Sequence, residues 1–133
     1  MERREQLAGN DMIMRSYTDL VVWQKAMDLV DEVYRLVSKL PKIEAYALSD
    51  QMRRAVVSIP SNIAEGQARA ADKQFLFFLS VARGSNAEIE TQLMICVRQN
   101  YLKESEIEKA MKLCDEVGKM LTSLMKSISG SRY

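Results

Sequence analysis

Apolar residues recur every three or four positions through most of the chain, which is the spacing of one face of an α-helix. The pattern predicts four helices that begin near residues 18, 46, 72 and 103. No segment shows the alternation of apolar and polar residues that is typical of a β-strand. Four long helices with short connections predict an all-α fold, an antiparallel up-down-up-down four-helix bundle over residues 18–128. Residues 1–17 are then a flexible N-terminal arm, and residues 129–133 are a frayed tail.

The first predicted helix has two apolar stripes instead of one. It follows a plausible N-cap at Thr18 or Asp19 and ends at Pro41. Its first stripe is Leu20, Trp23, Met27, Val30, Tyr34 and Val37, and its second is Val22, Ala26, Leu29, Val33, Leu36 and Leu40. One stripe is enough for the interior of a bundle, so the extra stripe predicts contact with another subunit. The candidate interface residues are Val22, Ala26, Leu29, Val33 and Leu36. The alternative is a wide face that lies deeper in a single bundle.

The second predicted helix contains a proline in the segment SIPSNIAEG, residues 58–66. The apolar positions stay in phase on both sides of Pro60, which indicates one continuous helix. A proline inside a helix removes the hydrogen bond to the carbonyl four residues earlier, here that of Val56, and costs about 3 kcal/mol or bends the helix. We therefore predict a helix kinked at Pro60, with Gly66 as its C-terminal cap. The alternative is a new helix that begins at Pro60.

The third and fourth predicted helices contain a glycine, an asparagine and two cysteines inside the helix or on its apolar stripe. Gly84 lies inside the third helix, where glycine costs about 1 kcal/mol relative to alanine, so we expect another backbone close to it. Asn86 takes an otherwise apolar position and should be hydrogen-bonded if it is buried. Cys96 and Cys114 fall on apolar stripes, and this placement predicts buried free thiols, with a disulfide as the alternative. The stripe of the fourth helix is Ile107, Ala110, Cys114, Val117, Leu121, Leu124 and Ile128.

Composition and charge narrow the class of protein. The chain has 133 residues, 47% hydrophobic and 28% charged, as in a globular domain. Its net charge is +1, from 19 basic and 18 acidic residues, without the basic excess that usually marks a nucleic-acid-binding protein. No apolar run is long enough to span a membrane, and the first residues do not resemble a secretory signal. Together with two cysteines, these features predict a cytoplasmic protein.

The residue types needed for common catalytic sites are missing. There is no histidine, which excludes Ser-His and Cys-His nucleophile pairs and every histidine metal ligand. Two cysteines alone cannot close a structural zinc site. Neither a glycine-rich phosphate loop nor the carboxylate motifs of di-iron bundles are present. We therefore predict that the protein is not an enzyme and has no cofactor, metal or small-molecule substrate.

Two groups of polar residues remain as candidate binding sites. A polar cluster around Pro60 comprises Arg53, Arg54, Ser58, Asn62, Glu65, Ser85 and Glu88. It either binds a partner or is structural, in which case Arg53 or Arg54 forms an ion pair with Glu88, and Asn62 and Glu65 bond amides at the start of the third helix. A possible nucleic-acid face on the fourth helix comprises Lys109, Lys112, Lys119 and Lys126. The alternative for these lysines is a solvated face.

Three stretches carry a resemblance to a known family: YTDLVVWQKAMDLV (17–30), SIPSNIAEG (58–66) and FLFFLSVARGSNAEIETQL (75–93). With the coiled-coil-like last helix, they resemble the 23S rRNA intervening sequence proteins, or S23 proteins. The resemblance covers roughly residues 15–125, and the N-terminal arm lies outside it.

The resemblance implies an antiparallel four-helix bundle that assembles into a ring, commonly a pentamer. Together with the bundle, the wide apolar face of the first helix and the missing catalytic residue types, it predicts a non-enzymatic interaction or scaffold protein whose partners are further copies of the chain, with association to RNA or the ribosome as an additional expectation. The accessory proteins of diversity-generating retroelements are similar in fold and bind nucleic acid. They are strongly basic and this chain is not, so nucleic-acid binding of that kind is the alternative function.

Overall fold

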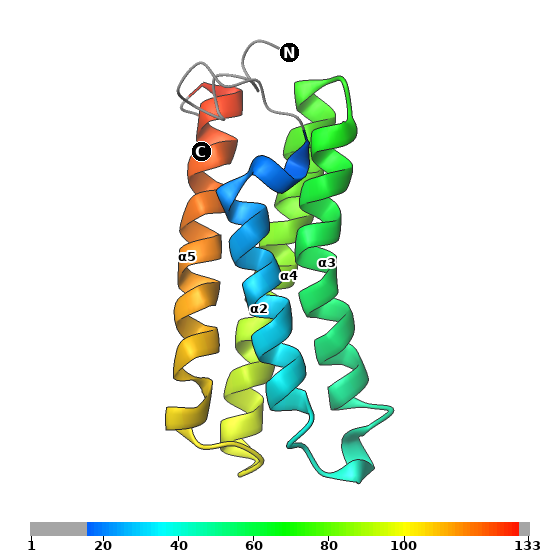
Figure 1. Cartoon of the computed structure of the whole chain (residues 1–133), viewed down its shortest axis with the longest axis vertical. Coiled ribbons are helices and arrows are strands. Elements are labelled where there is room, and N and C mark those ends of the chain that lie inside the picture. Colours follow the sequence, from blue (N-terminus) through cyan, green and yellow to red (C-terminus); the bar gives the residue numbers. More distant parts are fainter. Residues whose placement is uncertain (1–15, 131–133) are drawn as a thin grey trace.

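The structure, a computed structural model, describes residues 16–130 (Figure 1). Within this range the long helices are α2 (Val21–Val37), α3 (Leu48–Ala68), α4 (Asp72–Arg98) and α5 (Glu104–Ser129), and there are two short 3-10 helices, η1 (Tyr17–Asp19) and η2 (Lys42–Glu44). No strand occurs in this range. The predicted all-α fold with four long helices is therefore confirmed.

The four helices form a square in which each contacts its two neighbours. Helix α2 contacts α3 and α5, and α4 contacts the same two helices from the opposite corner. Figure 1 shows consecutive helices running in opposite directions, so that η1 and the end of α5 lie at the same end of the bundle. This arrangement gives the molecule four seams between neighbouring helices: α2 with α3, α3 with α4, α4 with α5, and α5 with α2.

The core lies between the four helices and explains why these segments are helical. Every helix contributes fully buried side chains from its predicted stripe; the largest include Leu29, Leu36, Met52, Ile59, Phe75, Leu93 and Leu121. Burying a side chain of this size stabilises the fold by roughly 1.5–3 kcal/mol. The helical conformation is favoured because it places all of these side chains on the face toward the core.

The predicted subunit interface on the first helix is wrong. Its five residues are 0–5% exposed within the single chain and belong to the core: Val22, Ala26, Leu29, Val33 and Leu36. Spacing alone gives two stripes of equal quality, and it cannot tell which one α3 and α5 cover. The other stripe is the one that reaches the surface, where Met27 is 38% and Tyr34 is 44% exposed.

The first helix begins differently from the prediction. The N-cap of α2 is Leu20, and not Thr18 or Asp19, and it makes no side-chain cap bond. Ser16 instead caps the short helix η1 that precedes α2, because its Oγ accepts a hydrogen bond from the Thr18 amide at 3.1 Å. The Asp19 carboxylate accepts one from the Ser16 amide at 3.3 Å. This cap begins η1, and the Tyr17 ring then contacts the Trp23 ring edge-on, with 5.5 Å between centroids. Residues 1–15 of the predicted arm lie outside the described residues, whereas Ser16 and Tyr17 belong to the folded part.

Helix α3 continues without interruption through Pro60, so the alternative of a new helix at this residue is wrong. The kink stays a prediction. Ser58 does not bond the backbone near the proline; its hydroxyl lies 2.8 Å from that of Ser85 on α4. The helix that contains Pro60 is therefore joined to α4 by the hydroxyl of Ser58, two positions before the proline.

The glycines have roles other than the predicted ones. Gly66 lies inside α3 and is not its cap: a Cβ there would lie 2.9 Å from Phe75 Cδ1 and from Phe78 Cβ. Gly84 has nothing within 4 Å of the corresponding position, so the predicted close approach of another backbone is wrong. Gly130 is left-handed (φ 78°) and caps α5 after Ser129. The remaining tail, residues 131–133, lies outside the described residues.

Both cysteines are buried and free, as predicted. Burial raises the pKa of the Cys96 thiol to about 11 and that of Cys114 to about 12. A thiol held in its protonated form is a poor nucleophile and a poor metal ligand. These cysteines therefore act as small apolar core residues.

Candidate functional site

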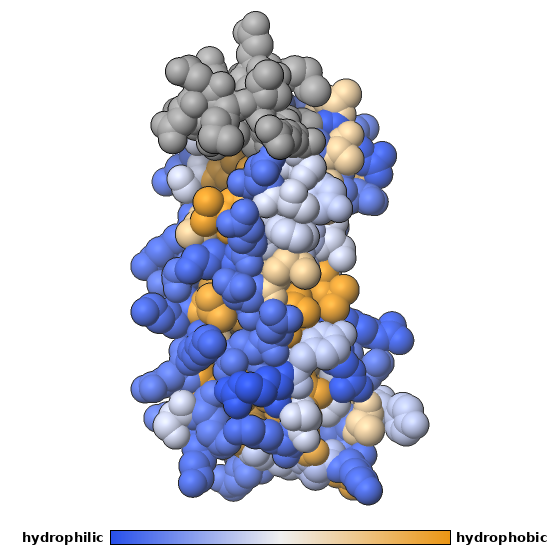
Figure 2. All heavy atoms as spheres, viewed as in Figure 1, coloured by the Kyte–Doolittle hydropathy of each residue, from blue (hydrophilic) through white to orange (hydrophobic). Residues whose placement is uncertain are grey.

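A shallow groove follows the seam between α2 and α3, and we call it the apolar groove. It encloses about 290 Å³ and is lined by Tyr17, Trp23, Met27, Val30, Val57, Pro60, Ser61 and Ala64. Figure 2 shows apolar side chains gathered over these two helices on the face that carries α2. Only one of the eight lining residues is a small polar one, so the groove offers water little to bond.

The groove is formed by the second apolar stripe of α2 and by the segment around Pro60. Trp23 and Val30 are half-buried, whereas Met27 and Val57 are 38% and 40% exposed. The proline ring has no N–H group, and its neighbour along the helix face, Ala64, is small. The two helices therefore leave a concave apolar surface, which is the shape that accepts a protruding apolar group.

A second apolar surface lies on the outer face of α4, and we call it the α4 ridge. It consists of Phe77, Val81 and Ile95, which share one helix face by their spacing and are 61%, 36% and 38% exposed. Gly84 lies on the same face, with open space around it. The ridge is convex, and it belongs to a helix that does not contact α2.

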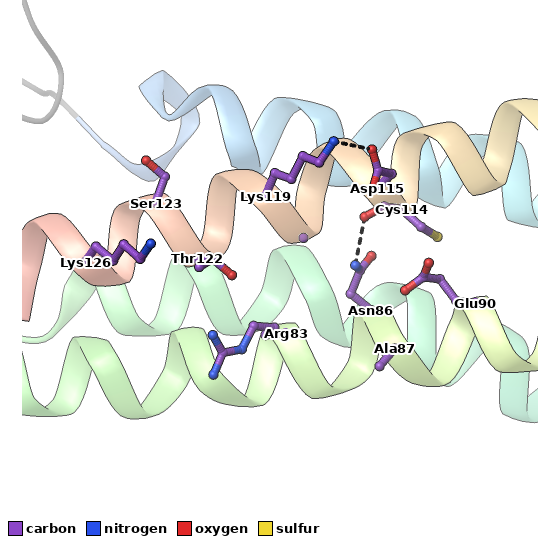
Figure 3. A pocket seen from close by; sticks show the side chains of 11 residues that line it. Arg83, Asn86, Ala87, Glu90, Cys114, Asp115, Lys119, Thr122, Ser123 and Lys126 are labelled. Atoms are coloured by element: carbon purple, nitrogen blue, oxygen red, sulfur yellow. Dashed lines mark hydrogen bonds and ion pairs between the residues drawn. The ribbon is translucent and has the colours of Figure 1, made fainter. Parts of the chain in front are cut away.

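A hollow larger than the apolar groove lies between α4 and α5, and we call it the polar groove (Figure 3). It encloses about 500 Å³ and is lined by Arg83, Asn86, Ala87, Glu90, Cys114, Asp115, Gly118, Lys119, Thr122, Ser123 and Lys126. Basic and acidic side chains come from both helices. Ala87 and Gly118 leave room between them because they are small.

Asn86 is the most buried polar residue of the polar groove. It is 3% exposed, and its Nδ2 donates a hydrogen bond to the Cys114 carbonyl at 2.9 Å. Its Oδ1 is buried and accepts no hydrogen bond. Gly118 makes this arrangement possible, because a Cβ at that position would lie 3.2 Å from Asn86 Nδ2. The predicted hydrogen bond of Asn86 is thus confirmed for one of its two polar atoms.

The charges of the polar groove are only partly paired. Lys119 Nζ lies 3.0 Å from Asp115 Oδ2. Glu90 is half-buried and makes no hydrogen bond or ion pair with the described part of the chain. Burial, and to a smaller extent the nearby Asp115, raises the pKa of Glu90 above its ordinary value. A hydrogen-bond donor entering the groove would stabilise this carboxylate.

The predicted polar cluster around Pro60 is assembled only in part. Ser58 and Ser85 bond across the seam between α3 and α4, and Asn62 Nδ2 donates to Ser58 Oγ at 2.9 Å and to the Ser58 carbonyl at 2.7 Å. These three residues form a small network in which each side chain has a partner inside the chain. The network joins two helices and leaves little capacity for a ligand.

The other members of the cluster are engaged elsewhere. Arg54 pairs with Asp50 at 3.0 Å, and Arg53 donates to the Ala45 carbonyl at 3.4 Å. Glu88 accepts from Gln92 at 3.3 Å, so the predicted ion pair between Glu88 and Arg53 or Arg54 is wrong. Glu65 pairs with Arg69 at 3.4 Å, and Asn62 bonds Ser58, so neither bonds an amide at the start of α4 as predicted.

The four predicted lysines are exposed but do not form one uniform face. Lys109 lies near Glu32 of α2, whose pKa it helps to lower. Lys119 and Lys126 line the polar groove, and Lys119 is already paired with Asp115. Lys112 is exposed on α5 outside that groove.

Sequence reasoning missed Arg83 and Glu90 as members of a site. A signal existed: Arg83, Asn86 and Glu90 are spaced by three and four residues and therefore share one face of a helix. The polar Asn86 marks this face, and the charged residues at the same spacing belong to it as well.

Two kinds of site are not found in residues 16–130. No group of three or more cysteine, aspartate or glutamate side chains in this range could hold a metal ion. None of the helices there is both long and apolar enough to cross a bilayer.

The comparison with protein families decides the identity of this bundle. The sequence matches the family described as 23S rRNA-intervening sequence protein over residues 18–123. The chain belongs to this family. No curated protein matches the sequence. As a member of the 23S rRNA-intervening sequence proteins, the chain also resembles a solved relative, a crystal structure of a protein with unknown function from the S23 ribosomal protein family of Bacteroides thetaiotaomicron VPI-5482. The two share 25% sequence identity and a TM-score of 0.74 over 80% of this chain and 99% of that chain.

Proposed function

We propose that this member of the family is a non-enzymatic interaction protein that works as a homo-oligomeric scaffold, a pentameric ring. The observation that carries the proposal is the apolar groove. Met27 and Val57, which line this groove, are 38% and 40% exposed. An exposed apolar surface of this kind marks a binding surface in a protein that is otherwise charged outside.

The two apolar surfaces support a ring over a simple dimer. The apolar groove is concave and lies on α2 and α3, whereas the α4 ridge is convex and lies on a different helix face. When two unlike surfaces of the same chain bind each other, the contact is heterologous, and repeated contacts close into a ring if the rotation fits. Phe77 of one copy, a residue that is 61% exposed, is the group that we expect in the groove of the next.

Charge substitutions in the groove test this proposal. Native mass spectrometry and light scattering of the purified chain should give about five times the 15.2 kDa chain mass. Met27→Glu and Val57→Glu should each shift the protein to monomer, because a carboxylate in a desolvated apolar contact is strongly unfavourable. The matched control is Ile43→Glu, at an 83% exposed apolar residue of η2 outside both surfaces. A wild-type chain of monomer mass, or groove variants that retain the oligomer, would refute the proposal.

Association with RNA or the ribosome is the second candidate function. The observation that favours it is the exposure of Lys109, Lys112, Lys119 and Lys126 along α5. In a ring these lysines recur in every subunit, so that a weak positive field is multiplied without a high net charge on each chain. The two free thiols fit a reducing compartment, and we place the protein in the cytoplasm.

Salt dependence tests this second function. If the lysines contact phosphates, RNA affinity should fall steeply between low and physiological salt. Lys109→Glu and Lys112→Glu should weaken it further, while Lys73→Glu, an exposed lysine at the start of α4, is the control. Absence of RNA binding at low salt would exclude this function and leave the scaffold role untouched.

A further inference from the structure

The polar groove contains a buried acceptor that the chain itself leaves unused. Asn86 Nδ2 is committed to the Cys114 carbonyl, and this bond fixes the amide, since a flipped amide would set Oδ1 against that carbonyl oxygen. Oδ1 is then left without a donor, although the residue is 97% covered. A buried acceptor in this state costs stability unless a donor reaches it. The side chain points from α4 toward α5, where the groove lies (Figure 3).

The charges along the groove are divided between its two ends. Arg83 and Lys126 lie at one end, with the Thr122 hydroxyl near them, and Glu90 lies toward the other, beyond Asn86 (Figure 3). Arg83 and Glu90 are seven residues apart on α4, which is about 10 Å along a helix. A ligand that satisfies both ends therefore carries an anionic group about 10 Å from a group of N–H donors.

We propose that the polar groove binds a guanine nucleotide, either free or as an unpaired nucleotide of an RNA. The phosphate lies at Arg83 and Lys126, because a guanidinium and an ammonium together match its oxygens. The N1–H and N2–H₂ edge of the base donates to the Glu90 carboxylate and, after a small shift of the Asn86 side chain that uncovers its Oδ1, to that oxygen. The flat ring lies over Ala87 and Gly118, which have no side chain long enough to prevent its approach.

Other small ligands match the groove less well. The α-ammonium and α-carboxylate of an amino acid are far closer than 10 Å, so these two groups cannot reach both ends. Inorganic phosphate leaves Glu90 and Asn86 without a donor. Adenine presents a single amino group next to an acceptor nitrogen, and uracil and cytosine are shorter and likewise lack two neighbouring donor groups.

Titration of the full-length chain with separate nucleotides tests the proposal. The probes are guanosine monophosphate, adenosine monophosphate, uridine monophosphate, guanosine and inorganic phosphate, followed by calorimetry or by amide chemical shifts. We expect guanosine monophosphate to bind at least roughly tenfold more tightly than the other nucleotides, which is the discrimination of one good bidentate contact. Absence of binding at millimolar guanosine monophosphate, or equal affinity for all three nucleotides, would overturn the proposal.

Paired variants separate the two ends of the groove. Glu90→Gln should weaken guanosine monophosphate roughly tenfold and reduce the preference for guanine, whereas Glu88→Gln on the outer side of α4 should change neither. Lys126→Ala should weaken all nucleotides alike, with Lys73→Ala, at an exposed lysine outside the groove, as its control. Asn86→Leu keeps the buried volume and should also abolish the guanine preference. Equal preference in wild type and Glu90→Gln would contradict the assignment.

A third arm identifies the source of the nucleotide. A single-stranded hexamer with one central guanine is compared with guanosine monophosphate and with the all-uridine hexamer. A hexamer that binds far more tightly than the mononucleotide, and only with guanine present, assigns the groove to RNA. Equal affinity of hexamer and mononucleotide assigns it to the free nucleotide. This inference does not depend on the ring, because none of these substitutions lies in the apolar groove or on the α4 ridge.

Discussion

The two flanks of α4, one toward α3 and one toward α5, differ in whether their polar side chains are fully hydrogen-bonded within the chain. On the flank toward α3, Gly66 brings the helices into close contact with Phe75 and Phe78, and the Ser58 and Ser85 hydroxyls bond each other. On the flank toward α5 the helices leave a groove, and Asn86 retains an acceptor without a donor.

The difference separates a seam that serves folding from one that is suited to a ligand. Where two helices must stay together, a satisfied polar network adds specificity at little cost. A polar atom left unsatisfied beside a charged groove has no folding benefit to explain it. The contrast can be tested by changing one flank at a time.

The largest effect is expected at Gly66. Gly66→Ala adds a methyl group 2.9 Å from Phe78 Cβ, an atom fixed to the α4 backbone, so the two helices must move apart. Overpacking of this kind costs roughly 1–3 kcal/mol. Gly84→Ala is the control: nothing lies within 4 Å there, and a helical alanine should stabilise the fold by about 1 kcal/mol. Urea unfolding measures both, and a loss at Gly84 equal to that at Gly66 would contradict the contrast.

A smaller loss is expected for the hydroxyl network on the same flank. Ser58→Ala removes the partner of Ser85 and one acceptor of Asn62 Nδ2. The free energy of unfolding should fall by about 1 kcal/mol, the usual net value of such a bond. Ser80→Ala, at an exposed serine that bonds only its own helix, should change it much less. Equal effects at the two serines would mean that the network is not structural.

The opposite flank should tolerate the loss of its buried amide. Asn86→Leu removes the hydrogen bond to Cys114 but also removes the unsatisfied Oδ1. These terms oppose each other, so stability should change by less than about 1 kcal/mol. Thermal and urea unfolding check this value. A loss of several kcal/mol would show that the amide is a folding element, like the serines of the other flank.

The smallest effect is a dependence on pH with opposite signs at two glutamates. The hydrogen bonds from Arg35 lower the pKa of Glu32 below its ordinary value of 4.5, so its contribution is complete above that value and is lost as the pH falls through the lowered pKa. Glu90 has a raised pKa, so its charge destabilises the fold at neutral pH, and this penalty disappears as the pH falls through that raised value. Arg35 is exposed to water, which weakens the contribution of its pair with Glu32 to stability.

Urea unfolding at pH 7 and pH 4 measures this dependence. Glu90→Gln should raise stability at pH 7 and not at pH 4, whereas Glu32→Gln should lower stability at pH 7 and less so at pH 4. If Glu90→Gln lowers stability at pH 7, the carboxylate has a partner in solution and the contrast with the satisfied flank is wrong.

The sequence predicted the long helices and most of the core, because the apolar period is set by each helix alone. Phe75, Ile89 and Leu93 were assigned correctly on this basis. The sequence could not decide which of the two stripes of the first helix is buried. The period is equally good for Val22 and for Trp23, and only the position of α3 and α5 decides which of them is buried.

Features that depend on two helices at once could not be predicted from the sequence. Gly66 looked like a cap because glycine is common at helix ends, yet its role is set by Phe75 and Phe78, which lie on the next helix. The polar groove needs Asn86 from one helix and Gly118 from another, 32 positions later in the sequence. Such pairs leave no periodic pattern in the sequence, so their role can be assigned only when the packing of the helices is known.

The short helix η1 and the last turn of α5, which are near the two ends of the described chain, lie at the same end of the bundle (Figure 1). A short flexible linker between them would therefore close the chain into a circle without crossing the core. New termini could be cut in the exposed connection that contains η2, and the order of helices would become α3, α4, α5, α2. All four seams would survive this circular permutation, because each depends on which helices are neighbours in space and not on which comes first in the gene.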